Sequence, residues 1–450
     1  MPPLRSAFPV LLLCCGAALA FGPASTAVGQ TREEKVRADR QAFEKLDFWI
    51  YGDLEAGYAK ARETGKPLLV VLRCIPCEEC VKLDDELVHQ NPTIRRLLDE
   101  FVCVRIVSTN GLDLSTFQFD YDQSFAAFFL NAEGAVYGRY GTRSHRTYWS
   151  DDVSVEGMAA AMEGALKLHR QWPKNRDALA GKRGPAPAFA APEQFPKLDG
   201  KYGSRIDYQG DVVKSCIHCH QVGDAMKALA RDSTKSFPEK ILFAYPHPKS
   251  VGLILDPKTR PLAREVVPDS PAAKAGFQEG DQILTLAGQP LLSIADVQWV
   301  LHQTSPQGAK LPAGVRRDGE LITVDLPLEE GWRRAEDISW RVSSWELRRM
   351  IFGGFLLEPL EDAARAERNL PADQTALRVK HVGQYGEHAV AKQAGVRVGD
   401  VLVSVDGRTD LLRETDVLAY GLENRRPGDR IEYVFLRGDQ RVPISIRQQE

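Results

Sequence analysis

The sequence lacks both the charge pattern typical of nucleic-acid-binding proteins and the long apolar runs typical of membrane proteins. Its 450 residues contain 58 Lys and Arg against 61 Asp and Glu, with no long basic block. Domains that bind nucleic acid cluster their positive charge, so we exclude nucleic acid as an expected partner. After the N-terminal stretch, no apolar run approaches the ~20 residues that a membrane-spanning helix needs. We therefore expect no transmembrane segment once an N-terminal signal is removed.

Cysteine is also scarce, with eight residues in the whole chain. Two of them, Cys14 and Cys15, lie in an apolar stretch that ends in the small-x-small sequence Ala18-Leu19-Ala20, which is typical of an export signal. We therefore expect residues 1–29 to be a signal peptide and the mature protein to be periplasmic or secreted. The remaining six cysteines are too few for a disulfide scaffold. Five of them lie in two tight clusters, which favours chemistry over stapling.

The first cluster consists of Cys74, Cys77 and Cys80. It follows the apolar run 67–72 and precedes a helical pattern at 81–88. This order makes a cysteine reactive, because a helix N-terminus stabilises the thiolate and lowers the thiol pKa from about 8.5. Two overlapping pairs, Cys74–Cys77 and Cys77–Cys80, are both candidates for the working pair. The alternative is a structural disulfide or a metal clip made by the same three residues.

Residues 40–175 resemble a thioredoxin-like domain. The resemblance rests on Gly65-Lys66-Pro67, the apolar strand, the cysteines and a second apolar strand at 101–107. It implies that Cys77 is the attacking thiol and Cys80 the resolving thiol, with Cys74 as an additional thiol in the loop.

The chain departs from the thioredoxin pattern at 121–125, Tyr-Asp-Gln-Ser-Phe. Thioredoxins carry a cis-proline at the corresponding place, and that loop helps to hold a substrate chain. Cys103 belongs to neither cluster. Because it lies mid-strand among apolar neighbours, we expect it to be a buried core residue.

The second cluster is Cys216-Ile217-His218-Cys219-His220, a Cys-x-x-Cys-His run. This run is the attachment motif of c-type haem, in which Cys216 and Cys219 form thioethers and His220 ligates the iron. His247 is a candidate for the second axial ligand. Covalent haem c is one reading of the motif. A structural zinc site that uses the two cysteines with His220, and a simple disulfide, are the others.

Two stretches of the C-terminal half share one order of landmarks. Residues 270–284 contain Ser-Pro-Ala, Ala-Gly and Gly-Asp, and residues 389–402 repeat the later part of this order. Both stretches resemble bacterial PDZ domains, which bind an extended peptide along a strand edge, often through its C-terminal carboxylate. The resemblance implies that the carboxylate is received by backbone amides of Gly252, Leu253, Ile254, Gly354, Phe355 and Leu356. Blocked grooves that only pack the chain together are the alternative.

The predicted fold class is therefore multidomain, with an α/β thioredoxin-like domain, a short cysteine-histidine segment and two mainly-β PDZ domains. The whole chain resembles the bacterial Trx7/PDZ domain-containing (seleno)protein family. We expect a signal peptide at 1–29, a thioredoxin-like domain at 40–175, a Pro/Ala-rich linker at 176–205, the Cys-x-x-Cys-His segment at 206–247, PDZ domains at 248–330 and 351–450, and a Trp-rich connector at 331–350.

The function expected from this order of domains is an exported thiol-disulfide oxidoreductase whose PDZ domains recruit protein or peptide partners. Two alternatives come from other classes. One is a non-enzymatic PDZ adaptor with structural cysteine clusters, and the other is a c-type haem electron-transfer protein. No serine, histidine and aspartate arrangement accompanies the PDZ landmarks, so a protease is not expected.

Overall fold

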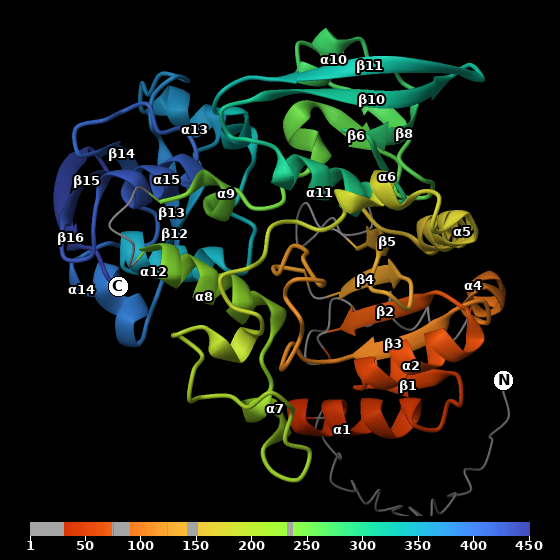
Figure 1. Cartoon of the computed structure of the whole chain (residues 1–450). Helices are drawn as coiled ribbons and strands as arrows, with labels where there is room; N and C mark the ends of the chain where they lie inside the picture. Colours follow the sequence, from red (N-terminus) through yellow and green to blue (C-terminus); the bar gives the residue numbers. More distant parts are fainter. Residues whose placement is uncertain (1–30, 74, 76–90, 124, 142–151, 232–236) are drawn as a thin grey trace, which may run out of the picture.

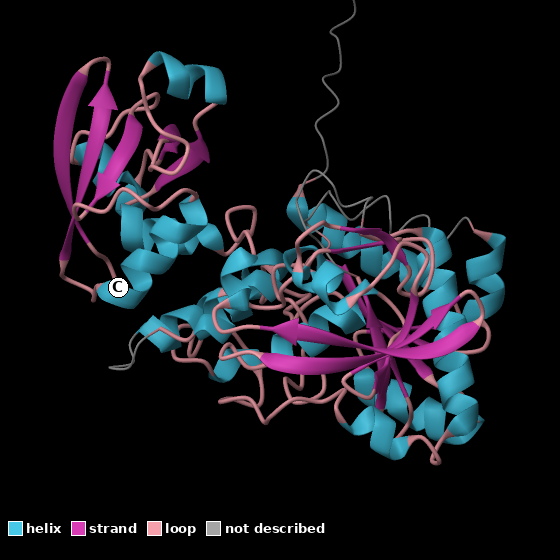
Figure 2. Cartoon of the chain, turned by 90° about the horizontal axis from the view of Figure 1, so that it is seen from above, coloured by secondary structure: helices cyan, strands magenta, loops and turns pink. Residues whose placement is uncertain are grey.

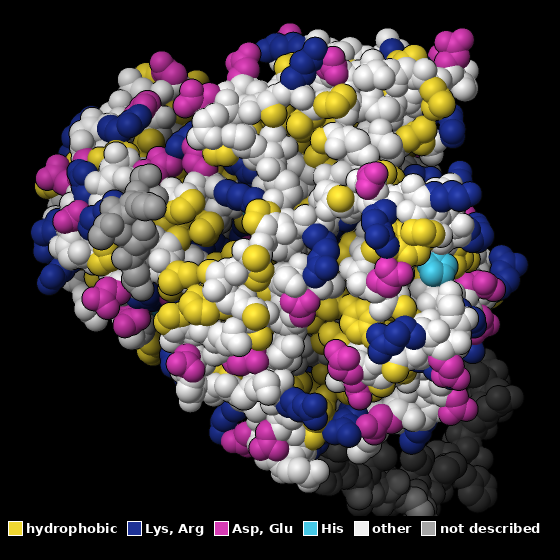
Figure 3. Space-filling view, viewed as in Figure 1, with side chains coloured by type: hydrophobic (Ala, Val, Ile, Leu, Met, Phe, Trp, Pro, Cys, Tyr) yellow, Lys and Arg dark blue, Asp and Glu magenta, His cyan; other side chains and the backbone are white. Residues whose placement is uncertain are grey.

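The computed structural model describes residues 31–73, 75, 91–123, 125–141, 152–231 and 237–450. Cys74, Cys77 and Cys80, the helix expected at 81–88 and the export signal lie outside these residues. Figure 1 shows three units: an N-terminal unit in red and orange, a middle unit (248–330) in green and teal, and a C-terminal unit (351–450) in blue. Charges of both signs are scattered over the face seen in Figure 3. Within the described residues, no helix combines the length and the apolarity that a bilayer crossing requires.

The N-terminal unit is a five-stranded sheet of order β1-β3-β2-β4-β5, in which β1 and β2 run parallel to β3, and β4 and β5 continue antiparallel. Strands β2 to β5 are buried at every position, as expected for a sheet covered on both faces. Cys103 is 1% exposed in its core, which confirms the prediction. The elements are α1 (Arg32–Phe43), β1 (Trp49–Tyr51), α2 (Leu54–Thr64), β2 (Leu68–Arg73), α4 (Pro92–Leu98), β3 (Val102–Ile106), β4 (Phe125–Leu130), β5 (Val136–Tyr140) and α5 (Val155–Gln171).

The segment expected to be an extended linker is instead packed against the other units. Lys182 is fully buried and pairs with Asp296 at 2.8 Å, and Phe195 and Leu198 form a small core with Ile217. The sequence did not predict these buried residues, because each is an isolated residue in a stretch rich in proline and alanine. The segment and its continuation contain α6 (Arg176–Ala180), η4 (Pro192–Gln194), α7 (Val212–Ser215), α8 (Cys219–Arg231) and α9 (Glu239–Leu242).

The middle unit combines a four-stranded sheet of order β11-β10-β8-β9 with the separate pair β6-β7. Its elements are η5 (Pro248–Val251), β6 (Leu253–Leu255), β7 (Ala263–Val266), α10 (Pro271–Ala275), β8 (Gln282–Leu286), β9 (Gln289–Pro290), α11 (Ile294–Gln303), β10 (Ala309–Arg317) and β11 (Glu320–Leu328).

The C-terminal unit is a five-stranded sheet of order β12-β13-β14-β15-β16. In Figure 2 this sheet is set apart from the other two units. The connector and the unit contain η6 (Trp332–Ala335), α12 (Ser344–Phe352), β12 (Phe355–Pro359), α13 (Asp362–Glu367), β13 (Leu377–Val382), η7 (Gly386–Ala389), α14 (Val390–Gln393), β14 (Val401–Val405), α15 (Glu414–Asn424), β15 (Arg430–Arg437) and β16 (Gln440–Arg447).

The middle unit and the C-terminal unit have the same ion pair, between a buried aspartate and a partly exposed arginine, at corresponding positions. In the middle unit Arg317 donates to both carboxylate oxygens of Asp281 at 2.7 Å, and in the C-terminal unit Arg437 donates to both oxygens of Asp400 at 2.8 and 2.7 Å. Each guanidinium also donates to the carbonyl of the glycine five residues before its aspartate. The repeated landmarks of the sequence thus correspond to a repeated tertiary contact.

The middle unit docks on the N-terminal unit through α11, which lies against β5 (Figure 1). Asp296 on α11 accepts hydrogen bonds from the backbone N–H groups of Arg139 and Leu292, in addition to its pair with Lys182. The Arg139 guanidinium lies 3.8 Å from the ring centroid of Trp299. Arg139, Lys182 and Asp296 are all buried in this contact, so separating the two units would cost the pairing of buried charges.

Candidate functional site

The second cysteine cluster packs against the ends of β2 and β3. Thr109, just after β3, donates from its N–H at 3.0 Å and its hydroxyl at 2.9 Å to the carbonyl of Ile217. The Cys216 Sγ lies 3.9 Å from the carbonyl oxygen of Val107. Cys219 packs in the same core cluster as residues of β2. The fold therefore joins the Cys-x-x-Cys-His segment to the N-terminal unit, rather than leaving it as a separate module.

This contact lies at the sheet edge that leads into the first cysteine cluster. Strand β2 ends at Arg73, the residue before Cys74. Ile75 is buried in a cluster with Val107 and Val212, and Val212 belongs to α7, which leads directly to Cys216. Arg73 and Ile75, the described residues on either side of Cys74, thus lie close to the second cysteine cluster. The two clusters are more than a hundred residues apart in the sequence.

The chemistry of Cys216 is that of a covered thiol. It is 5% exposed, and burial raises the pKa of its thiol to about 11, although a hydrogen bond to Ser108 acts in the other direction. The rings of His218 and His220 are parallel with centroids 5.7 Å apart. Burial lowers the pKa of His218 to about 4, assisted by His220. At neutral pH the Cys216 thiol is protonated and His218 is uncharged.

Within the part of the chain that the structure describes, no space for a haem is seen where this segment meets the N-terminal unit. Ile217, His218 and Cys219 line a cavity of about 10 Å³ there with the ends of β2 and β3, which holds about one water molecule. Among the described residues, no group of three or more His, Cys, Asp or Glu side chains could hold a metal ion, so the geometry gives the zinc reading no support either.

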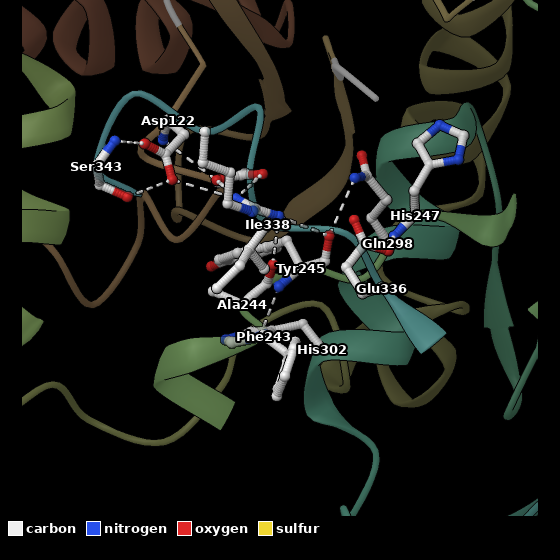
Figure 4. A network of polar contacts seen from close by, with 12 residues as sticks. Asp122, Phe243, Ala244, Tyr245, His247, Gln298, His302, Glu336, Ile338 and Ser343 are labelled. Carbon is white, nitrogen blue, oxygen red and sulfur yellow. Dashed lines mark hydrogen bonds and ion pairs between the residues drawn. The ribbon is translucent and has the colours of Figure 1, made fainter. Parts of the chain in front are cut away.

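The loop that replaces the thioredoxin cis-proline is held by a distant arginine. Arg341, from the connector between the two C-terminal units, donates to both oxygens of Asp120 at 2.8 Å and to Asp122 at 3.2 Å. Ser343 donates to Asp122 through its N–H at 2.8 Å and its hydroxyl at 2.9 Å, as Figure 4 shows. The loop ends at Phe125, whose register partner in β2 is Arg73. The loop therefore borders the end of β2.

The two carboxylates of this network differ, because burial and the neighbouring Asp122 raise the pKa of Asp120 against the effect of Arg341. Burial disfavours the charged form of Asp122, but Lys227 and Arg341, with the hydrogen bonds from Ser343, outweigh that cost and lower its pKa. Sequence reasoning missed Arg341. Trp332 and Trp340 of the same connector are buried.

The peptide-binding residues expected in the middle unit lie at the turn into β6. Gly252 adopts a left-handed conformation with φ of 84°, and its N–H donates to the carbonyl of Lys249. Leu253 and Ile254 follow in β6, which pairs with β7 along one edge. In the described part of the chain, no side chain accepts a hydrogen bond from the N–H groups of β6. The other edge of β6 therefore has the backbone donors that an added strand requires.

The corresponding turn of the C-terminal unit is partly occupied by its own chain. Gly354 has a φ of 97° and donates its N–H to Arg348, while Phe355 and Leu356 begin β12. The first residue of α15, Glu414, accepts the N–H of Leu357 in β12 at 2.7 Å and forms a buried ion pair with Arg348. A peptide on this strand would have to displace the Glu414 carboxylate.

Comparison with known families agrees with these geometries. Residues 49–132 match the family model described as thioredoxin-like, and residues 262–311 match the model of the PDZ domain. The chain contains a thioredoxin-like domain and a PDZ domain. The first is the N-terminal unit, and the second is the middle unit, whose β8 and α11 lie within the matched range.

Curated relatives share only part of their length with this chain. The periplasmic serine endoprotease DegP of Salmonella typhimurium is 29% identical over 152 residues, which are 34% of this chain and 27% of that protein. The periplasmic pH-dependent serine endoprotease DegQ of Escherichia coli is 29% identical over 152 residues, 34% of this chain and 29% of DegQ. A putative zinc metalloprotease of Brucella suis is 40% identical over 62 residues, 14% and 16% of the two chains. The chain thus spans less than a third of each of these relatives.

Among solved structures, the HtrA-type protease AlgW with a decapeptide is 15% identical and has a TM-score of 0.20, over 31% of this chain and 49% of that chain. The serine endoprotease from Yersinia pestis is 24% identical with a TM-score of 0.18, over 26% and 37%. Scores this low carry no conclusion about the present fold.

Proposed function

We propose that this protein is an exported thiol-disulfide oxidoreductase whose PDZ domain recruits protein or peptide substrates. The observation that carries the proposal is the position of the first cysteine cluster in the thioredoxin-like domain. Arg73 ends the central strand β2, and Cys74, Cys77 and Cys80 follow it directly in the sequence. Export is supported by the apolar N-terminus and by the similarity to periplasmic proteins over about a third of the chain.

The proposed reaction is two successive thiol-disulfide exchanges. The Cys77 thiolate attacks one sulfur of a substrate disulfide, forms a mixed disulfide and releases the other substrate sulfur as a thiolate. The Cys80 thiolate then attacks the Cys77 sulfur and releases the second substrate thiol. The substrate gains two electrons and two protons, and the protein is left with a Cys77–Cys80 disulfide.

Single-turnover exchange between the reduced protein and a fluorogenic glutathione disulfide tests this proposal. We expect Cys77→Ser to slow exchange at least about 100-fold, because the attacking thiolate is gone. Cys80→Ser should accumulate the mixed disulfide, visible as one added glutathione in the intact mass. If Cys74 resolves instead, Cys74→Ser will accumulate it. Cys103→Ala is the matched control, because that thiol is buried in the core, and it should keep the wild-type rate. Full activity of both Cys77→Ser and Cys80→Ser would refute the proposal.

The PDZ contribution is tested on an array of random peptides with free or amidated C-termini. We propose that the edge of β6 receives the peptide, and that the C-terminal unit is a second PDZ domain whose groove is closed by Glu414. Ile254→Asp should therefore lower binding to free C-termini. Leu356→Asp, at the corresponding position of the C-terminal unit, should leave most of it. Equal losses, or no preference for free carboxylates, would contradict this assignment.

A non-enzymatic PDZ adaptor is the second candidate, favoured by the covered thiol of Cys216. If this candidate is correct, the protein binds peptides but does not catalyse thiol-disulfide exchange. No cysteine substitution then changes the rate of exchange. The third candidate, an electron-transfer protein with covalent haem c, is decided by the visible spectrum and intact mass of protein exported from a haem-maturing host. A mass without haem would remove it.

A further inference from the structure

A cavity of about 330 Å³ lies where α8, α9, the middle unit and the loop at 120–122 meet. Its volume falls in the range of small-molecule pockets, about 300–1,000 Å³. None of the proposed redox or peptide-binding residues lines it. The lining residues are Asp120, Tyr121, Asp122, Gly223, Met226, Lys227, Pro238, Lys240, Ile241, Ala244, Tyr245 and His302.

Most of the cavity wall is apolar. Tyr121 reaches it from the loop, Met226 from α8 and Ile241 from α9. On the side of the PDZ domain the rings of Tyr245 and His302 stack with centroids 3.9 Å apart (Figure 4). A wall of this composition favours a ligand with an apolar body, because burying that body removes apolar surface from water.

The carboxylates in the wall are already neutralised. Asp120 and Asp122 bind Arg341, and Lys227, which is hydrogen-bonded to Ser343, lies close to Asp122. The two carboxylates accept hydrogen bonds from Arg341, from the N–H and hydroxyl of Ser343 and from the N–H of Asp122, and therefore offer little attraction for a cationic ligand.

Lys240 is different, because no carboxylate of the described residues pairs with it. Its ammonium donates to the amide oxygen of Gln303 at 2.8 Å, and its pKa is lowered by burial and by the nearby Arg333. Arg333 in turn donates only to carbonyl groups, at 2.7 to 3.0 Å, and burial lowers its pKa to about 10. Beside them His302 is uncharged, since burial lowers its pKa well below the ordinary value. At this end of the cavity, neither Lys240 nor Arg333 forms an ion pair with a carboxylate of the described residues, and the nearby Glu239 pairs with Arg334 at 2.7 Å.

We propose that this cavity binds a small apolar carboxylate, with the carboxylate paired to Lys240 and the apolar body lying among Tyr121, Met226 and Ile241. A hydrogen bond to a charged group typically contributes tenfold or more to affinity. The ligand would contact α8 at Gly223, which is three residues after His220, and it would contact the loop that borders the end of β2. The site does not depend on the proposed oxidoreductase activity.

Isothermal titration calorimetry on the exported mature protein tests the proposal with decanoate and decanol, which share the apolar chain and differ in charge. We expect saturable one-to-one binding of decanoate, about 10-fold or more tighter than decanol. Lys240→Met should remove that difference. Lys258→Met, at an exposed lysine outside the cavity, should keep it. Met226→Trp should weaken both probes by filling the cavity.

Equal affinity of the two probes for the wild-type protein, or no binding of decanoate, would overturn the proposal without any variant being needed. Unchanged decanoate binding in a folded Lys240→Met protein would do the same. A dipeptide ending in leucine that binds more tightly than decanoate, and depends on Lys240, would replace the small-molecule ligand with a peptide.

Discussion

Replacing Arg341 with leucine should release the loop of the thioredoxin-like domain that borders the end of β2. The Arg341 side chain is 2% exposed and makes three hydrogen bonds to Asp120 and Asp122, whose side chains are 3% and 6% exposed. Its second terminal nitrogen donates to the carbonyl of Ala244 at 2.6 Å. One side chain thus connects the connector, the loop and the segment before the PDZ domain.

The loss of stability expected for Arg341→Leu depends on which hydrogen bonds the Asp120 carboxylate retains. Asp122 retains the hydrogen bonds from Ser343, whereas within the described residues the Asp120 side chain retains only the backbone N–H of Asp122 at 3.2 Å. Removing one partner of a buried ion pair costs about 3–5 kcal/mol, because the other charge stays buried and uncompensated. Adding Asp120→Asn to Arg341→Leu should recover part of this loss, since the stranded charge is then gone.

Native-state hydrogen exchange of residues 112–123 measures this loss locally, which suits a chain of several units that need not unfold together. A loss of about 3 kcal/mol corresponds to exchange roughly 100-fold faster or more. Arg408→Leu is the control, because Arg408 pairs with Asp410 on the surface and should change exchange little. If Arg341→Leu exchanges as slowly as the control, the reasoning about this network is wrong.

Three further predictions concern buried groups between the units. Burial raises the pKa of Glu336 from its ordinary value of 4.5 to about 7, so the wild type loses stability as pH rises from about 4.5 through 7. Relative to the wild type, Glu336→Gln should therefore raise the free energy of unfolding by urea by up to ~3 kcal/mol at pH 8 and leave it unchanged at pH 4. Lys182→Met leaves Asp296 buried without its cation, and limited proteolysis between the first two units should become much faster, with a loss of about 3–5 kcal/mol. Gly138→Val should separate the same units in small-angle scattering, because a Cβ at Gly138 would lie 2.6 Å from the Leu292 side chain.

Local pattern was sufficient to predict the elements. The strands β2 and β3 lie within one residue of the apolar stretches at 67–72 and 101–107, because a short continuous apolar run is typical of a strand buried on both faces.

The contacts that join the units were not visible in the same way. Arg341 meets Asp120 across 221 positions, and Thr109 meets Ile217 across 108. A single charged or polar residue is not part of a periodic hydrophobic pattern. The surrounding sequence therefore does not indicate which distant residue it will pair with. The same holds for Glu414, whose hydrogen bond to Leu357 closes an edge that the repeated landmarks had suggested was accessible.

The sequence by itself determined which domains are present, because their cores, turns and cysteine motifs are local patterns. Only the tertiary structure decided that the Cys-x-x-Cys-His segment packs against the thioredoxin-like sheet and that an arginine of the connector binds the loop lacking proline. It also decided that Lys240 lines a cavity between the units, where no described carboxylate pairs with it. These depend on buried pairs of polar groups that desolvation makes costly to separate, and such pairs are chosen by the packing of whole units.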